Sequence, residues 1–84
     1  MEKNMNEEEI ILFTEIMIDR LNVKNEEYGG KTWKIATPHH LINHLRKQVD
    51  KLEKCVMEKN KKISEKSADV ANFAMMIADV CGGL

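Results

Sequence analysis

The chain has 84 residues, which is enough for one domain and too few for two. Its 13 Lys and Arg residues nearly balance its 14 Asp and Glu residues, so no overall field favours nucleic acid or an acidic membrane surface. No apolar run approaches the roughly 20 residues of a membrane span, and the first residues are polar and acidic, unlike a signal peptide. We therefore expect a single cytoplasmic domain over residues 1–84, with residues 1–5 as a frayed tail and no nucleic-acid or membrane partner.

The first predicted helix begins near Asn6, with glutamates in its first turn that face the positive end of the helix dipole. Its apolar residues recur at helical spacing in two rows: Ile10, Phe13, Met17 and Leu21 in one, Ile11 and Ile18 in the other. Two rows make a broad apolar face, which indicates contact with more than one neighbouring helix.

Residues 22–36 are predicted to be a linker, because this stretch is polar and contains Gly29–Gly30. It also contains Tyr28 and Trp33. Two interpretations of this aromatic pair remain open: it plugs the end of a helical bundle, or Trp33 offers a ring on which a ligand stacks.

Two further helices complete an all-α chain. Thr37 is a suitable N-cap and Pro38 suits the first helical position, so the second helix is predicted to begin there and to end near Lys59–Asn60. Its apolar stripe is Leu41, Leu45, Val49, Leu52 and Val56. The third helix is predicted over residues 63–80 and is ended by Gly82–Gly83.

A polar stripe runs along the third helix. At 100° per residue its members fall in one narrow sector: Glu65, Asp69, Asn72, Met76 and Asp79. A solvated face is one interpretation, but no Lys, Arg or Gln lies between Asp69 and Asp79. Carboxylate and amide oxygens suit Mg²⁺, so the alternative is a metal site with Glu65, Asp69 and Asp79 as ligands and Asn72 beside them.

Residues 68–79 resemble the final core helix of the MazG-like, all-α nucleoside triphosphate pyrophosphohydrolases. The Gly-Gly linker before Trp33 and the leucine-spaced second helix are also similar, so the resemblance covers roughly residues 28–82. It implies a three-helix chain that forms part of an oligomeric bundle, as a homodimer or homotetramer. It also implies cleavage of nucleoside triphosphates to monophosphate and pyrophosphate, with Mg²⁺ held by an ExxE pair and an ExxD pair on facing helices.

The resemblance assigns these positions one by one. Asp69 matches the Asp of ExxD, while the Glu of that motif falls on Lys66. The ExxE positions fall on Gln48 and Lys51, and His44 lies on the same stripe. We therefore expect a degenerate magnesium site with weak or no pyrophosphohydrolase activity, and the question of enzymatic activity stays open.

Other interpretations of the same residues also remain open. One is metal-free binding of a phosphate-bearing ligand, such as a nucleotide, by Lys51, Lys66 and His44, with Asn72, Gln48 and Trp33 as further ligand-binding candidates. Another is catalysis through a rearranged site. A third is a non-enzymatic helical module for oligomerisation or interaction. Its interface would consist of the first predicted helix and the outer rows of the third predicted helix. Cys55 and Cys81 are expected to be two buried free thiols.

Overall fold

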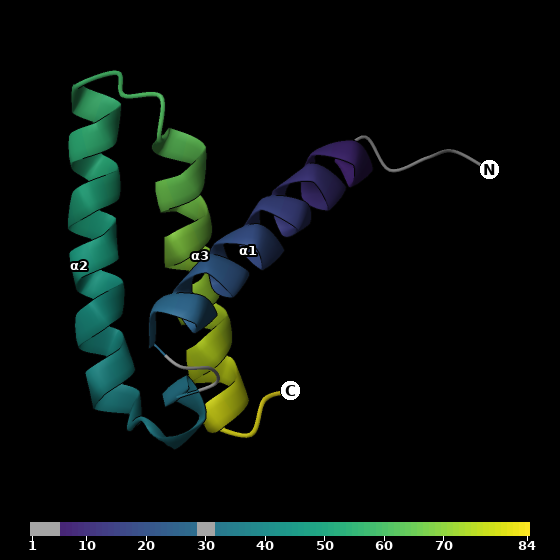
Figure 1. Ribbon diagram of the computed structural model, residues 1–84, viewed down its shortest axis with the longest axis vertical. Helices are drawn as coiled ribbons and strands as arrows, with labels where there is room; N and C mark the ends of the chain where they lie inside the picture. The colour runs from purple at the N-terminus through teal and green to yellow at the C-terminus, as the bar shows by residue number, and fades with distance from the viewer. Residues whose placement is uncertain (1–5, 29–31) are drawn as a thin grey trace.

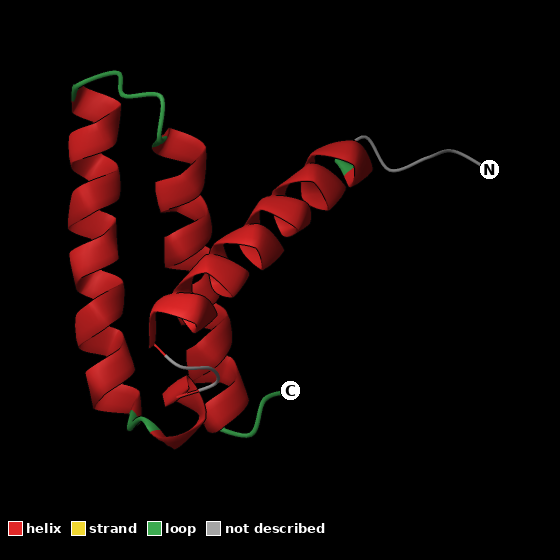
Figure 2. Cartoon of the chain, in the orientation of Figure 1, coloured by secondary structure: helices red, strands yellow, loops and turns green. Residues whose placement is uncertain are grey.

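The computed structural model describes residues 6–28 and 32–84 of the chain. Every regular element within them is helical (Figure 2). The elements are α1 (Glu7–Tyr28), the short 3₁₀ helix η1 (Thr32–Ile35), α2 (Pro38–Met57) and α3 (Ile63–Val80). The predicted all-α fold with three helices is thus confirmed.

The helices α2 and α3 form an antiparallel hairpin, and α1 crosses this hairpin. α2 and α3 lie side by side, and α1 packs mainly against α3 (Figure 1). The N-terminal half of α1 extends away from the hairpin, while η1 returns the chain to the C-terminal end of α3. The polar stripe of α3 therefore lies between the other elements.

The ends of α2 and α3 follow the local sequence. The Thr37 hydroxyl accepts a hydrogen bond from the His40 backbone N–H at 3.2 Å, and Pro38 occupies the first turn, as predicted. After α3, Gly82 adopts φ +81°, and the Gly83 N–H donates to the Ala78 carbonyl at 2.7 Å. This pattern is a Schellman motif, and it explains why α3 ends just before Gly82–Gly83, as predicted from the sequence.

Two parts of the sequence-based description differ from the structure or lie beyond it. α1 continues to Tyr28, so the predicted linker begins too early. The reason is that residues 22–28 contain neither Gly nor Pro, and polar composition alone does not stop a helix. The predicted frayed tail at residues 1–5, Gly29–Gly30 and the Tyr28 side chain lie outside the part that the structure describes.

The buried core of the described residues contains almost as many polar residues as apolar ones. Its buried apolar residues are Leu41, Cys55, Ala68 and Met76, and its buried polar residues are Gln48, Asp69 and Asn72. The predicted α2 stripe is wrong at Val49 and Val56, which are exposed, because the buried row follows i, i+7 and i+14 from Leu41 through Gln48 to Cys55.

Cys55 is buried as expected, whereas the expected burial of Cys81 is wrong, because Cys81 lies in the exposed turn after α3. Both thiols are free. None of the described helices combines the length and the apolar character that crossing a membrane would need.

Candidate functional site

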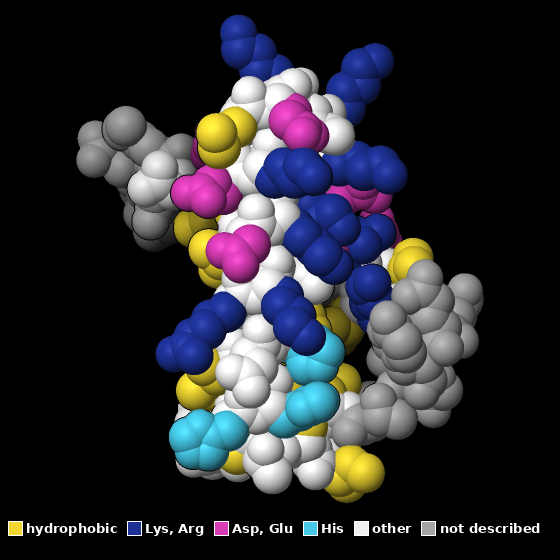
Figure 3. Space-filling view, turned by 90° about the vertical axis from the view of Figure 1, so that its left-hand side faces the viewer, with side chains coloured by type: hydrophobic (Ala, Val, Ile, Leu, Met, Phe, Trp, Pro, Cys, Tyr) yellow, Lys and Arg dark blue, Asp and Glu magenta, His cyan; other side chains and the backbone are white. Residues whose placement is uncertain are grey.

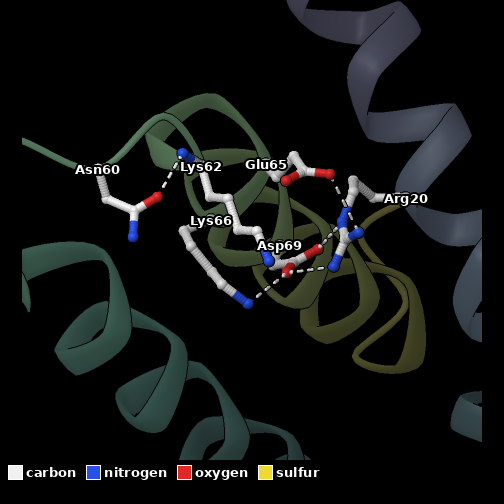
Figure 4. A network of polar contacts seen from close by, with 6 residues as sticks. All are labelled: Arg20, Asn60, Lys62, Glu65, Lys66 and Asp69. Carbon is white, nitrogen blue, oxygen red and sulfur yellow. Dashed lines mark hydrogen bonds and ion pairs between the residues drawn. The ribbon is translucent and has the colours of Figure 1, made fainter. Parts of the chain in front are cut away.

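The centre of the polar stripe is an ion pair between α1 and α3. Arg20 donates from Nε to Asp69 Oδ1 at 3.0 Å and from Nη2 to Asp69 Oδ2 at 3.1 Å (Figure 4). Only 4% of the Asp69 side chain is exposed. A carboxylate buried to this degree needs a charged, hydrogen-bonding partner, and the planar guanidinium meets both oxygens at once.

Two neighbours on α3 extend this ion pair. Arg20 Nη1 lies 3.5 Å from Glu65 Oε1, and Lys66 Nζ lies 3.9 Å from Asp69 Oδ2. Figure 4 shows Glu65 and Asp69 converging on the same guanidinium. Two cations therefore contact the Asp69 carboxylate, which is the group that the resemblance makes a magnesium ligand.

The donor chemistry around Asp69 does not fit a magnesium ion. Mg²⁺ requires a near-octahedral set of oxygen ligands, while both Asp69 oxygens accept hydrogen bonds from Arg20. Within the described residues, no three His, Cys, Asp or Glu side chains are grouped so that they could hold a metal ion.

The three predicted metal ligands are not brought together. Glu65 and Asp69 share Arg20, but Asp79 lies ten residues farther along α3, or about 15 Å along its axis. There Asp79 forms an ion pair with Lys34 of η1. Asp79 thus connects the C-terminal end of α3 to η1 through an ion pair.

Asn72 has a structural contact of its own. Its Nδ2 donates to the backbone carbonyl of Met17 at 2.9 Å, and only 5% of the residue is exposed. Together with buried Asp69 and Met76, this contact shows that the centre of the stripe faces the interior. The interpretation of the stripe as a solvated face is therefore wrong for its centre.

A pocket of about 730 Å³ opens beside this stripe. Its walls come from α1, η1, α2 and α3. The predicted ligand-binding residues that line it are Trp33, His44, Gln48, Lys51 and Asn72. Lys66 is not among the lining residues, and its ammonium group lies near Asp69 instead.

The α2 wall of the pocket has the predicted register. His44, Gln48 and Lys51 follow each other at i, i+4 and i+7, and all three line the same pocket as Asp69 and Asn72 of α3. The structure thus brings the two rows face to face.

Basic and aromatic residues outside the predicted ligand-binding set also line the pocket. They are Lys24, Lys47, His40 and Phe73. Figure 3 shows Lys and Arg side chains gathered above the histidines on this side of the molecule. Lys47 and Lys51 thus add positive charges to the α2 side of the pocket.

The two histidines in the pocket wall interact closely. The Nε2 atoms of His40 and His44 lie 3.2 Å apart, and the His44 ring stacks on Phe73 with centroids 5.5 Å apart and planes within 6°. Burial lowers the pKa of His44 below its ordinary value, and the charges of His40, Lys47 and Lys51 lower it further. His44 is therefore uncharged at neutral pH.

Arg20 is the principal residue that sequence reasoning missed. It follows Met17 by three residues and so lies close to the predicted apolar row of α1. The sequence did contain a signal for this pair. Arg20 lies at the edge of an apolar row, and Asp69 lies on a largely apolar part of α3, so each charge needs a partner.

Comparisons of the chain with protein-family models, curated proteins and solved structures found no match. The resemblance to the MazG-like proteins rests on the sequence motifs alone and stays a prediction. The chemistry of the pocket follows from its own residues: it offers lysines to an anion and aromatic rings to a flat group.

Proposed function

We propose that the pocket binds a phosphate-bearing ligand of the nucleotide class without a divalent cation. In this proposal the chain keeps the helix arrangement of the MazG-like pyrophosphohydrolases and has weak or no pyrophosphohydrolase activity. The observation that carries it is the two-point contact of Arg20 with Asp69, which occupies both oxygens of the carboxylate. A permanent side-chain cation thus replaces a metal ion at this position.

The charges of the pocket favour an anion. Lys47 and Lys51 line it from α2, whereas the Asp69 carboxylate is neutralised by Arg20. Lysine ammonium groups bind phosphate oxygens as point charges. Phe73 and Trp33 add aromatic surface to the same pocket, which suits a ligand that joins phosphates to a ring.

Hydrolysis is not favoured by the same residues. Metal-assisted cleavage of a triphosphate needs carboxylates that hold the metal and a water that the metal activates. The α2 wall offers Gln48 and Lys51 where the resemblance expects two glutamates. A lysine at that position repels a divalent cation, so we expect binding without efficient turnover.

A pyrophosphate-release screen over the common ribo- and deoxyribonucleoside triphosphates, with Mg²⁺ or Mn²⁺, tests this proposal together with thermal shifts. We expect pyrophosphate or a nucleotide to raise the melting temperature in the presence of a chelator, and no turnover. Metal-dependent turnover that disappears in Asp69→Asn would contradict a metal-free binding site.

A second candidate function is an oligomerisation or interaction module, favoured by the exposed apolar residues of α1. These are Ile10, Ile11, Leu12, Ile18 and Val23. In a small protein such a surface is typical of an interface, so this proposal expects a homodimer or homotetramer. Light scattering should give a mass that is a multiple of 9.7 kDa and that falls in Ile11→Glu. A monomeric wild-type protein would rule out self-association.

A further inference from the structure

Two buried polar atoms, in residues that line the pocket, have no hydrogen-bond partner within the described part of the chain. They are the carbonyl oxygen of Gln48 and the indole Nε1 of Trp33. Gln48 is only 7% exposed, so its amide is largely removed from bulk water. Buried polar groups are normally hydrogen-bonded, and an unpaired one lowers stability. These two atoms therefore require an explanation.

No described neighbour of Gln48 supplies the missing bond. The facing residues on α3 use their own polar atoms elsewhere, because Asp69 accepts from Arg20 and Asn72 donates to the Met17 carbonyl. A glutamine amide carries one acceptor and two donors, and rotation about its last torsion exchanges them. Gln48 can therefore present either group to a molecule in the pocket.

The residues around Gln48 indicate which chemical groups a molecule in the pocket must have. Lys51 lies one turn farther along α2, about 4.5 Å along the axis, and provides a positive charge. Trp33 and Phe73 provide aromatic surface, and the indole of Trp33 adds a donor that lacks an acceptor. A flat ring with a donor and an acceptor on its edge, joined to phosphate, satisfies all of these groups.

We propose that Gln48 is a specificity-determining residue that reads the polar edge of a nucleobase, with Trp33 Nε1 as the second hydrogen-bonding group. This inference rests on the proposed phosphate-binding function and assigns Gln48 a role different from the metal-ligand role that the resemblance would give its position. The phosphates then lie toward Lys51, and the ring edge lies against the Gln48 amide.

Calorimetric titration in the presence of a chelator tests this assignment, with inorganic pyrophosphate and four ribonucleoside diphosphates as probes. The wild-type protein should bind at least one nucleoside diphosphate more tightly than pyrophosphate. Gln48→Met keeps the side-chain length and removes both hydrogen-bonding groups. It should weaken that nucleotide by about 5- to 140-fold, the range for unpaired polar groups, and leave pyrophosphate unchanged. Trp33→Phe should weaken it in the same direction.

Asp50→Asn, at an exposed position of α2 that does not line the pocket, is the matched control and should bind both probes as the wild type does. The melting temperature separates the two possible roles of Gln48. If Gln48 only supports the fold, Gln48→Met lowers the melting temperature and weakens both probes together. Removing an unpaired polar group should instead leave the melting temperature unchanged or higher.

The outcomes distinguish this inference from the proposed function. Pyrophosphate binding with no preference for any nucleotide, or a preference that survives in Gln48→Met, would overturn the role of Gln48 and leave the phosphate site intact. Failure of pyrophosphate and of all four nucleotides to bind would overturn both.

Discussion

Arg20 of α1 and Asp69 of α3 form a two-point ion pair, with Nε–Oδ1 at 3.0 Å and Nη2–Oδ2 at 3.1 Å, across 49 residues of sequence. This contact joins the crossing helix to the hairpin. It also occupies the one carboxylate that faces the pocket from α3. The same ion pair thus holds the helices together and favours binding of an anion over binding of a metal ion in the pocket.

Removing Arg20 should destabilise the protein. In Arg20→Leu the Asp69 carboxylate, which is only 4% exposed in the native protein, loses its two-point partner, and breaking a buried pair from one side costs about 3 kcal/mol. Chemical denaturation of Arg20→Leu and of the double variant Arg20→Leu/Asp69→Leu measures the loss. The double variant should recover part of the stability, because it leaves no unpaired buried charge.

The ion pair between Lys34 and Asp79 is the matched comparison, because it is more exposed. Lys34→Ala should lower the free energy of unfolding by no more than about 1 kcal/mol. Equal losses in Arg20→Leu and Lys34→Ala would contradict the central role of the Arg20–Asp69 pair.

Lys51 should contribute to anion binding in a way that its neighbour Lys54 does not. Lys51 lines the pocket and Lys54 does not, although both are exposed on α2. Lys51→Ala should weaken pyrophosphate by about tenfold, because it removes one charged contact. Lys54→Ala changes the net charge equally and should leave the affinity within about twofold at physiological salt, where screening limits distant charges.

Protonation of His44 should make stability depend on pH. Its pKa in the folded protein lies below the value of about 6.5 for a free histidine, so the unfolded chain takes up the proton first. Stability is therefore complete above about pH 6.5 and falls as the pH drops through the folded-state pKa. In His44→Gln the melting temperature should differ less between neutral and mildly acidic pH than it does in the wild type, as measured by thermal unfolding. His39→Gln, at an exposed position, should keep the wild-type difference.

Asn72 should stabilise the crossing of α1 and α3. Asn72→Asp removes the donor to the Met17 carbonyl and places a buried carboxylate beside it, so we expect a loss of about 2 kcal/mol. Hydrogen exchange should then accelerate in α1 more than in α2. Unchanged protection of α1 would show that this bond does not hold the helix.

The sequence predicted most of the fold because its local signals agree. Thr37 and Pro38 mark the start of α2, and the Gly pair at 82–83 marks the end of α3. The length of α1 was underestimated because only polarity separates residues 22–28 from the preceding turns. The exposure of Val49 was missed because the spacing of apolar residues along a helix does not show which of two adjacent rows faces a neighbouring helix.

Several of the candidate site residues line one pocket, whereas the ion-pair partner of Asp69 was not predicted. The resemblance placed Gln48 and Asp69 on facing helices, and both residues line one pocket in the structure. Helical spacing marks Arg20 and Asp69 separately but does not pair them, because they lie on different helices and 49 residues apart in the sequence. The angle at which α1 crosses α3 decides that contact, and no local signal encodes it.

Titration of the wild-type protein with pyrophosphate, first with a chelator and then with Mg²⁺, tests the central claim most directly. If Arg20 replaces a metal ion beside Asp69, the affinity should be the same or weaker with Mg²⁺, because the cation competes for the ligand and gains no carboxylate in the protein. Pyrophosphate binding that requires Mg²⁺ would contradict the account.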